Sequence, residues 1–233
     1  YNKSGATLTV TNSTLSGNTA GSVGGGIFND NGAILSITNS TLSGNTAGSV
    51  GGGIYNKSGA TLTVTNSTLS GNSAVYGGGG IVNIGTLTVT NSTLSGNSAN
   101  YGGGILNYNG NVNITNSTIS GNSANSGGGI YNISGSTTLT NSTLSGNTAG
   151  SVGGGIFNDN GAILSITNST LSGNSANGGG GIFNSGTLAI SNSTLSGNTA
   201  NYGGGILNDR GTLTVTNSTL SGNTANYGGG ILN

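Results

Sequence analysis

The stretch that decides the fold is residues 12–18, Asn-Ser-Thr-Leu-Ser-Gly-Asn, because its opening triplet returns along the whole chain. Asn-Ser-Thr occurs nine times, beginning at Asn12, Asn39, Asn66, Asn91, Asn116, Asn141, Asn168, Asn192 and Asn217. Successive copies are 27, 27, 25, 25, 25, 27, 24 and 25 residues apart. A nearly fixed period of this size indicates one structural unit stacked on copies of itself. The sequence therefore predicts a solenoid whose surface consists of repeated columns of side chains.

The composition of the chain excludes several classes of protein. Its 233 residues include 50 glycines but no Pro, Cys, Met, Trp or His, and charged residues make up 3% with a net charge of zero. Disordered chains are usually rich in charge or proline, whereas this one is rich in Thr, Ile, Val and Leu. The near absence of basic residues removes the electrostatic attraction on which nucleic-acid binding depends. No run of 18 apolar residues exists, so no membrane-spanning helix is expected.

Exact duplications within the chain suggest a piece of a longer array. Residues 1–18 recur unchanged as residues 55–72, and residues 18–45 recur as 147–174. The chain starts and stops in the middle of a repeat, without a start methionine, a signal peptide or a polar capping repeat. We expect residues 1–233 to form a single repeat domain that is an uncapped window of that array.

Each unit is predicted to contain three short strands separated by turns. The first strand is the alternating run before the triplet, as in residues 212–216, whose period of two is typical of a strand with one buried face. The second strand contains the leucine of the repeated stretch, with Ile119 in its place in the fifth unit. The third strand follows a triple glycine. The sequence thus predicts an all-β fold, a parallel β-helix of about nine coils with 24–27 residues and three strands each.

The pattern also predicts which side chains face inward. The first residue of the third strand is always isoleucine, which indicates packed core, whereas the next residue varies among Phe, Tyr, Val and Leu, which indicates the outer surface. In the first strand, two apolar residues such as Leu8 and Val10 are expected inside, although the sixth unit departs from this pattern at Thr137. In the fourth unit, Leu94 and Ile105 are expected to be buried, with Thr90 and Leu106 exposed.

Two motifs resemble those of known bacterial families. The units pair Gly-Gly-Gly-Ile, as at residues 24–27, with Leu-Ser-Gly-Asn, as at residues 15–18. This resembles the Gly-Gly-Ala-Ile and Phe-x-x-Asn repeats of chlamydial polymorphic outer-membrane proteins, with Gly in place of Ala and Leu or Ile in place of Phe. It is similar also to bacterial β-helix proteins with Asn-Ser-Thr-Ile-Ser-Gly-Asn units, which often end in a surface-anchor domain. The resemblance implies a right-handed β-helix and a bacterial cell-surface or extracellular location.

Asparagine columns are the first candidate for a specific role. One column is expected to form a hydrogen-bonded ladder of stacked amides. It consists of Asn18, Asn45, Asn72, Asn97, Asn122, Asn147, Asn174, Asn198 and Asn223. A second column runs from Asn29 to Asn233, and the triplet asparagines form a third. The alternative interpretation of the triplet is N-glycosylation, for which each copy is a formal acceptor.

Threonines and aromatic residues form two further candidate surfaces. Outward Thr-x-Thr pairs on the first strand, such as Thr212 and Thr214, resemble the ice-binding face of some solenoid antifreeze proteins, but Ile34, Asn111 and Ala189 interrupt the array. Exposed aromatic side chains often mark an interaction surface. The candidates for lateral contact are Phe28, Tyr55, Tyr131, Phe157, Phe183, Tyr76, Tyr101, Tyr202 and Tyr227.

The sequence does not predict an enzyme, a metal site or a cofactor site. Without His, Cys or Glu, acid–base chemistry would depend on Asp30, Asp159 and Asp209 alone, which lie in the same turn of different units. We therefore expect an extracellular structural rod, either a fibre subunit or a surface stalk. The alternatives are an adhesin or carbohydrate-binding passenger domain and an ice-binding protein. The expected partners are further copies of the chain, joined end to end or laterally, or a polysaccharide or host surface.

Overall fold

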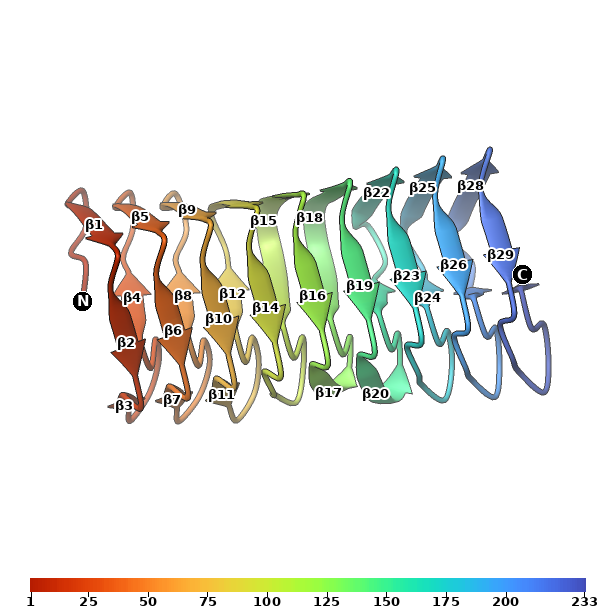
Figure 1. Cartoon of the computed structure of the whole chain (residues 1–233), viewed down its shortest axis with the longest axis horizontal. Coiled ribbons are helices and arrows are strands. Elements are labelled where there is room, and N and C mark those ends of the chain that lie inside the picture. Colours follow the sequence, from red (N-terminus) through yellow and green to blue (C-terminus); the bar gives the residue numbers. More distant parts are fainter.

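The computed structural model describes all 233 residues as a stack of coils built from strands and turns. The coils lie side by side along one axis, with the two termini at opposite ends (Figure 1). Every strand pairing in the stack is parallel, so the fold is the predicted parallel β-solenoid. No helix in it has the length and apolar character needed to cross a bilayer.

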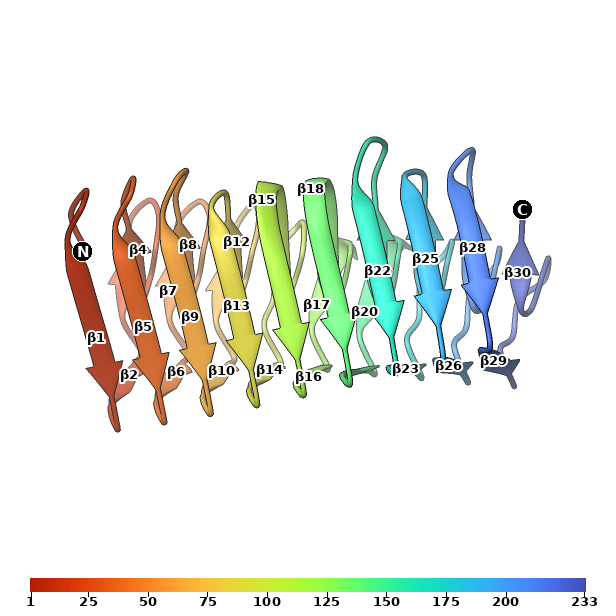
Figure 2. The same ribbon diagram turned by 90° about the horizontal axis from the view of Figure 1, so that it is seen from above.

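Each coil contributes one strand to each of three faces. Face A carries the strands that precede the triplets, which have five residues in seven coils and are the last five residues of the eleven-residue β15 and β18 in the other two (Figure 2). Its strands are β1 (Thr7–Thr11), β5 (Ile34–Thr38), β9 (Thr61–Thr65), β13 (Thr86–Thr90), β15 (Ile105–Thr115), β18 (Ile130–Thr140), β22 (Ile163–Thr167), β25 (Thr187–Ser191) and β28 (Thr212–Thr216).

Face B is a nine-stranded sheet made from the Thr-Leu-Ser or Thr-Ile-Ser segment of every coil. Its strands are β2 (Thr14–Ser16), β6 (Thr41–Ser43), β10 (Thr68–Ser70), β14 (Thr93–Ser95), β16 (Thr118–Ser120), β19 (Thr143–Ser145), β23 (Thr170–Ser172), β26 (Thr194–Ser196) and β29 (Thr219–Ser221).

Face C carries the strands that follow the triple glycine, and in two coils these strands are the first residues of β15 and β18. The others are β4 (Ile27–Asn29), β8 (Ile54–Asn56), β12 (Ile81–Asn83), β21 (Ile156–Asn158), β24 (Ile182–Asn184), β27 (Ile206–Asn208) and β30 (Ile231–Leu232). Five coils have a fourth, short strand in the turn between faces B and C, in addition to the three strands per coil that the sequence predicts. These short strands are β3 (Thr19–Ala20), β7 (Thr46–Ala47), β11 (Ser73–Ala74), β17 (Ser123–Ser126) and β20 (Thr148–Val152).

The strands keep one register from coil to coil. Leu8 pairs with Leu35 on face A, and Leu15 pairs with Leu42 on face B, so equivalent residues stack directly on one another. A one-residue slip would turn the apolar set outward. The apolar residues form one continuous core of 28 buried side chains along the axis.

The predicted inward residues are buried in the interior coils and partly buried in the end coils, as at Leu8 and Val10, whereas the predicted outward ones are less exposed than expected. Leu94 and Ile105 are completely buried, as predicted. Thr90 and Leu106 were expected to be exposed, but both are half-buried, and Val82 on face C is 3% exposed. The reason is the stacking itself, because the same position in the coil on either side covers the flanks of each outward side chain. The same effect acts on the core, because the inward Ile231 of the last coil has a neighbour on one side only and is 41% exposed.

The triple glycines allow the coils to approach closely before face C. The first glycine has a left-handed backbone, with φ of 61° at Gly102, which costs glycine little. The second lies against the next coil, since a Cβ on Gly103 would sit 2.5 Å from the carbonyl oxygen of Gly128. Any larger residue at this position would push adjacent coils apart, which explains the repeated triplet.

Thr137 is a defect in the otherwise apolar core. It lies in register between Val112 and Leu164 and is 1% exposed, yet its Oγ1 has no hydrogen-bond partner. A buried hydroxyl without a partner costs about 1–3 kcal/mol of desolvation.

We expect Thr137→Val to stabilise the protein by about 1 kcal/mol, because valine keeps the shape of threonine and removes the unpaired hydroxyl. The matched control is Thr138→Val, which changes the adjacent outward residue of β18 and should have an effect within about 0.5 kcal/mol. Chemical denaturation of the three proteins measures both effects. A loss of stability in Thr137→Val would show that the hydroxyl has a partner after all.

Candidate interaction surfaces

The predicted asparagine ladder is present at the turn that follows face B. The side-chain Oδ1 of Asn97 accepts hydrogen bonds from the backbone N–H and the Nδ2 of Asn72, at 2.9 and 3.0 Å. Its Nδ2 donates to the Leu69 carbonyl at 3.0 Å and to Asn122 Oδ1 at 2.9 Å. The amide is completely buried, and all four of its hydrogen bonds are made. The side-chain links of this pattern join every neighbouring pair from Asn18 to Asn223.

A second buried ladder lies at the end of face C. Asn107 Nδ2 donates to Asn132 Oδ1 at 2.8 Å and to the Gly110 carbonyl at 3.0 Å. This column extends from Asn2, which the sequence analysis did not include, to Asn233. Both ladders point the same way, since each Nδ2 donates to the coil of higher residue number. The two ladders therefore give the stack a direction.

The triplet asparagines do not form the third ladder that was predicted. All nine have a left-handed backbone, with φ between 47° and 51°, and their side chains are exposed. The neighbouring serines form the ladder instead. The backbone N–H of Ser92 donates to Ser117 Oγ at 3.1 Å, and Ser92 Oγ donates to the Thr90 carbonyl at 2.8 Å. The signal was available in the sequence, because serine follows the triplet asparagine in every unit.

The aromatic residues on face C form stacked groups. Phe28 stacks on Tyr55 with ring centroids 5.4 Å apart, and Tyr131 stacks on Phe157 at 4.5 Å. Phe157 meets Phe183 edge to face at 5.1 Å. Val82 and Leu106 occupy the positions between Tyr55 and Tyr131, so the stripe is discontinuous. These side chains are half-buried, which makes them part of the wall of the solenoid as well as of its surface.

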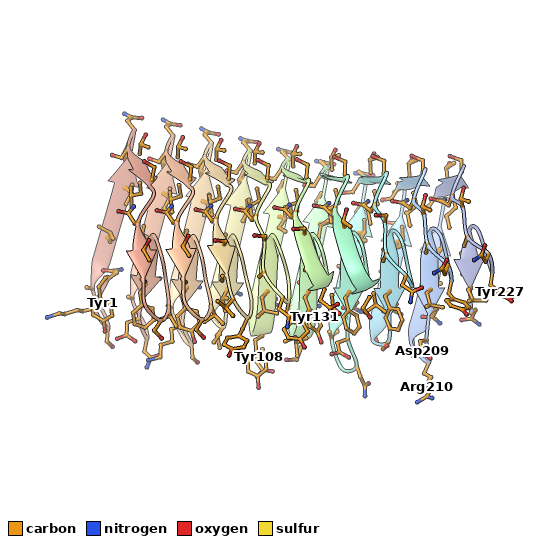
Figure 3. The ribbon with its side chains drawn as sticks, turned by 90° about the horizontal axis from the view of Figure 1, so that it is seen from below. Tyr1, Tyr108, Tyr131, Asp209, Arg210 and Tyr227 are labelled. Carbon is orange, nitrogen blue, oxygen red and sulfur yellow. The ribbon has the colours of Figure 1, made fainter.

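The tyrosines of the turn before the glycines are the more exposed aromatic group. Tyr76 and Tyr227 are 59% and 61% exposed, and Tyr101 and Tyr202 are 40% and 47% exposed. Tyr202 stacks on Tyr227 at 5.3 Å. Tyr108, which was not among the aromatic residues predicted from the sequence, is 47% exposed and lies within β15, at the turn between faces C and A (Figure 3).

The charged residues gather in the turn between faces C and A. Asp30 accepts hydrogen bonds from the Tyr1 hydroxyl, the Asn31 backbone N–H and Lys57 Nζ, the last at 3.1 Å. These contacts, with that of Tyr1 the strongest, lower the pKa of Asp30 to about 2. The carboxylate therefore contributes stability above its usual pKa, and this contribution is lost as the pH falls toward 2.

Tyr131 gives the solenoid a second pH dependence. Burial raises its pKa well above the usual value, and the 2.8 Å hydrogen bond from its hydroxyl to Asp159 raises it further. Because the folded pKa is raised, the neutral tyrosine stabilises the fold up to about pH 10, the pKa of an unfolded tyrosine. The contribution is lost as the pH rises beyond it.

We expect Asp159→Asn to lower the pKa of Tyr131 without restoring the usual value, because burial is the larger cause. Spectrophotometric titration against Tyr131→Phe measures this, and an unchanged titration curve in Tyr131→Phe would contradict the assignment.

Two shallow depressions interrupt the surface. The first, about 320 Å³, lies on face A across β13, β15 and β18 and is lined mainly by hydroxyl and amide side chains such as Thr88, Asn113 and Thr138. The second, about 220 Å³, lies in the charged turn, where Ser185 separates Asp159 from Asp209. Arg210 beside it points away from the ribbon (Figure 3). No three His, Cys, Asp or Glu side chains come together as a metal site. The surface of the solenoid therefore provides hydroxyl and amide groups for hydrogen bonding and tyrosine rings for stacking.

Residues 39–57 match the family model of the Chlamydia polymorphic membrane protein repeat. The matched segment runs from the triplet Asn39 through the ladder residue Asn45 and the triple glycine to the charged turn at Lys57. The chain has no significant match among curated proteins or among solved structures. Together with the parallel solenoid, the matched segment makes this a β-helix repeat protein that resembles chlamydial polymorphic membrane protein repeats. That family is one of bacterial outer-surface proteins, and such repeats are typically non-catalytic.

Proposed function

We propose that the chain is a non-catalytic structural rod of the bacterial cell surface, either a stalk or a fibre subunit. The observation that carries the proposal is the set of three axial ladders, two of asparagine and one of serine, that join each coil to the next. Every ladder side chain in the interior of the stack is buried and paired along the axis. A rod built in this way resists bending, because any tilt between two coils lengthens several buried hydrogen bonds together.

The direction of the ladders bears on self-association. Within each asparagine ladder, the side-chain Oδ1 accepts from the preceding coil and the Nδ2 donates to the Oδ1 of the following coil, so two copies that joined end to end would do so head to tail. Lateral association would use the aromatic residues of face C and of the turn before it.

An adhesin is the second candidate, and the exposed turn tyrosines favour it. Tyr76, Tyr101, Tyr202 and Tyr227 lie along one edge of the rod, where their rings are available to a flat partner such as a sugar ring. In this proposal the solenoid displays the tyrosines, and the ligand is a polysaccharide or a host surface.

Labelling of intact cells tests the proposed location. Antibodies against the folded chain should label the cells that produce it before permeabilisation, and labelling only after lysis would contradict a surface rod.

A variant with Tyr101→Ala and Tyr202→Ala separates the two candidates. A stalk should keep its length and surface display in electron micrographs, with unchanged attachment of the cells. Attachment lost without a change of rod shape would favour the adhesin.

A further inference from the structure

The repeated stretch Asn-Ser-Thr-Leu-Ser-Gly-Asn contains two residues that the fold does not require. In the fourth unit, Asn91 and Gly96 have left-handed backbones, and Ser92 and Asn97 belong to ladders. Leu94 is core. Thr93 and Ser95 alone have no such role, since both point outward from face B and are half-buried. Thr and Ser nevertheless occupy these two positions in all nine units.

Outward positions on face A are less regular. The column of Thr90 is threonine in every coil except for Ser191, but the neighbouring column varies. The column of face A that contains Thr88 also contains Ser36, Asn113 and Ala189. Face B instead has one unbroken column of threonine and one of serine. The threonines are Thr14, Thr41, Thr68, Thr93, Thr118, Thr143, Thr170, Thr194 and Thr219. The serines are Ser16, Ser43, Ser70, Ser95, Ser120, Ser145, Ser172, Ser196 and Ser221.

The hydroxyl groups of face B are also free. None of them makes a side-chain hydrogen bond to another group of the protein. On face A, threonines such as Thr88 are free as well, but the set is broken where Ser136 donates to Asn111 Oδ1 at 2.8 Å and Thr167 pairs with Ser191 at 3.2 Å. The free hydroxyls therefore form a regular set of donors and acceptors that only an external partner can use.

The geometry of face B fixes the repeat of that partner. The sheet is in register throughout, and its nine strands lie side by side in the order of the coils (Figure 1). Neighbouring strands of a sheet are about 4.8 Å apart, and alternate residues of a parallel strand are about 6.6 Å apart. Threonine has few χ1 rotamers, so its hydroxyl and methyl groups are held in place before binding. A matching partner is flat, rigid and periodic in two directions.

We propose that face B binds the surface of ice through this array of hydroxyl and methyl groups. Its two repeats are comparable to those of the oxygen lattice of hexagonal ice, so each threonine hydroxyl can take the place of a lattice water while its methyl group fits between lattice positions. Face B carries no charge, and all six charged residues of the chain lie in the turn between faces C and A. It also carries no aromatic or amide side chain, the groups with which sugar-binding sites usually hold a polysaccharide. The interrupted Thr-x-Thr array of face A is therefore not the face that we assign to ice.

Ice-growth measurements on the 233-residue chain test this inference with a matched pair of variants in one coil. Thr93→Tyr places a bulky side chain on the fourth of the nine strands of face B, and Thr88→Tyr does the same on face A. We expect the unmodified chain to depress the freezing point below the melting point and to enter slowly growing ice. Thr93→Tyr should reduce both effects several-fold, and Thr88→Tyr should leave them unchanged. Far-UV spectra and melting temperatures of both variants should match those of the unmodified chain, so that a loss is not due to unfolding.

Three results would overturn the inference. One is an unmodified chain that neither separates the freezing and melting points nor enters ice. Another is an equal loss in both variants, which would remove the assignment to face B. The third is retention on crystalline chitin or cellulose that depends on Thr93 without any effect on ice, which would make a polysaccharide the partner. None of these results bears on the surface rod, which rests on the axial ladders.

Discussion

Asn97→Ala is expected to destabilise the solenoid by about 2–6 kcal/mol, because it leaves two buried donors of Asn72 without an acceptor and each such group costs about 1–3 kcal/mol. The backbone N–H and one N–H of the Asn72 side chain both depend on Asn97 Oδ1. The substitution also removes the donor to the Leu69 carbonyl and interrupts the ladder in the fourth coil. Chemical denaturation followed by far-UV circular dichroism measures the loss.

Asn100→Ala is the matched control for this substitution. Asn100 lies three residues further along the same coil, it is exposed, and its side chain makes no hydrogen bond to the protein. Its truncation should change the stability by less than about 0.5 kcal/mol. If Asn97→Ala and Asn100→Ala unfolded at the same denaturant concentration, the ladder would contribute nothing to stability, and the argument for a stiff rod would fail.

Asn97→Asp probes the direction of the same ladder. A carboxylate can accept from Asn72, but it would face two acceptors, the Leu69 carbonyl and Asn122 Oδ1, without a proton to offer them. Burial and these acceptors favour the protonated acid, so the folded pKa of the new Asp rises above its unfolded value of about 3.9. Relative to the unmodified chain, the variant should therefore be least destabilised below pH 4 and should lose stability as the pH rises through the folded pKa, which chemical denaturation of both proteins across this pH range measures.

Periodicity made the core and the stacking predictable from the sequence. Residues such as Leu94 and Ile105 occur at positions restricted to one or two side-chain shapes, and a position with that restriction is usually buried. The asparagine ladder was predictable for a related reason, since an amide that recurs at a fixed place in each coil meets its own copy above and below. The internal repetition predicts all of the coils, whereas the match to the chlamydial repeat covers residues 39–57.

The serine ladder could not be distinguished from an asparagine ladder in the sequence, because it depends on the backbone conformation and the local hydrogen bonds of the triplet. Asn91 and Ser92 recur equally often, and only the backbone shows that the asparagine is left-handed and the serine is buried. Leu106 is less exposed than the sequence predicts. The alternation of residues along a strand shows that its side chain points outward, but not that the same position in each neighbouring coil shields it from solvent. The free hydroxyls of Thr93 and Ser95 could be recognised only after every other residue of the repeated stretch had received a structural role.

Ile105→Ala should cost about 2–5 kcal/mol, since it leaves a cavity in the middle of the core where Ile81 and Ile130 stack on either side. Leu106→Ala, one residue further along β15, should cost about 1 kcal/mol, because a half-buried side chain loses less apolar contact. The stability of a stacked array is close to a sum over neighbouring units, so a weakened fourth coil should also loosen its contact with the third and fifth. Hydrogen exchange should therefore accelerate at Ile81 and Ile130 in Ile105→Ala and remain slow at the same amides in Leu106→Ala. Equal losses of stability in the two variants would mean that the outer wall of the rod holds the coils together as strongly as its core.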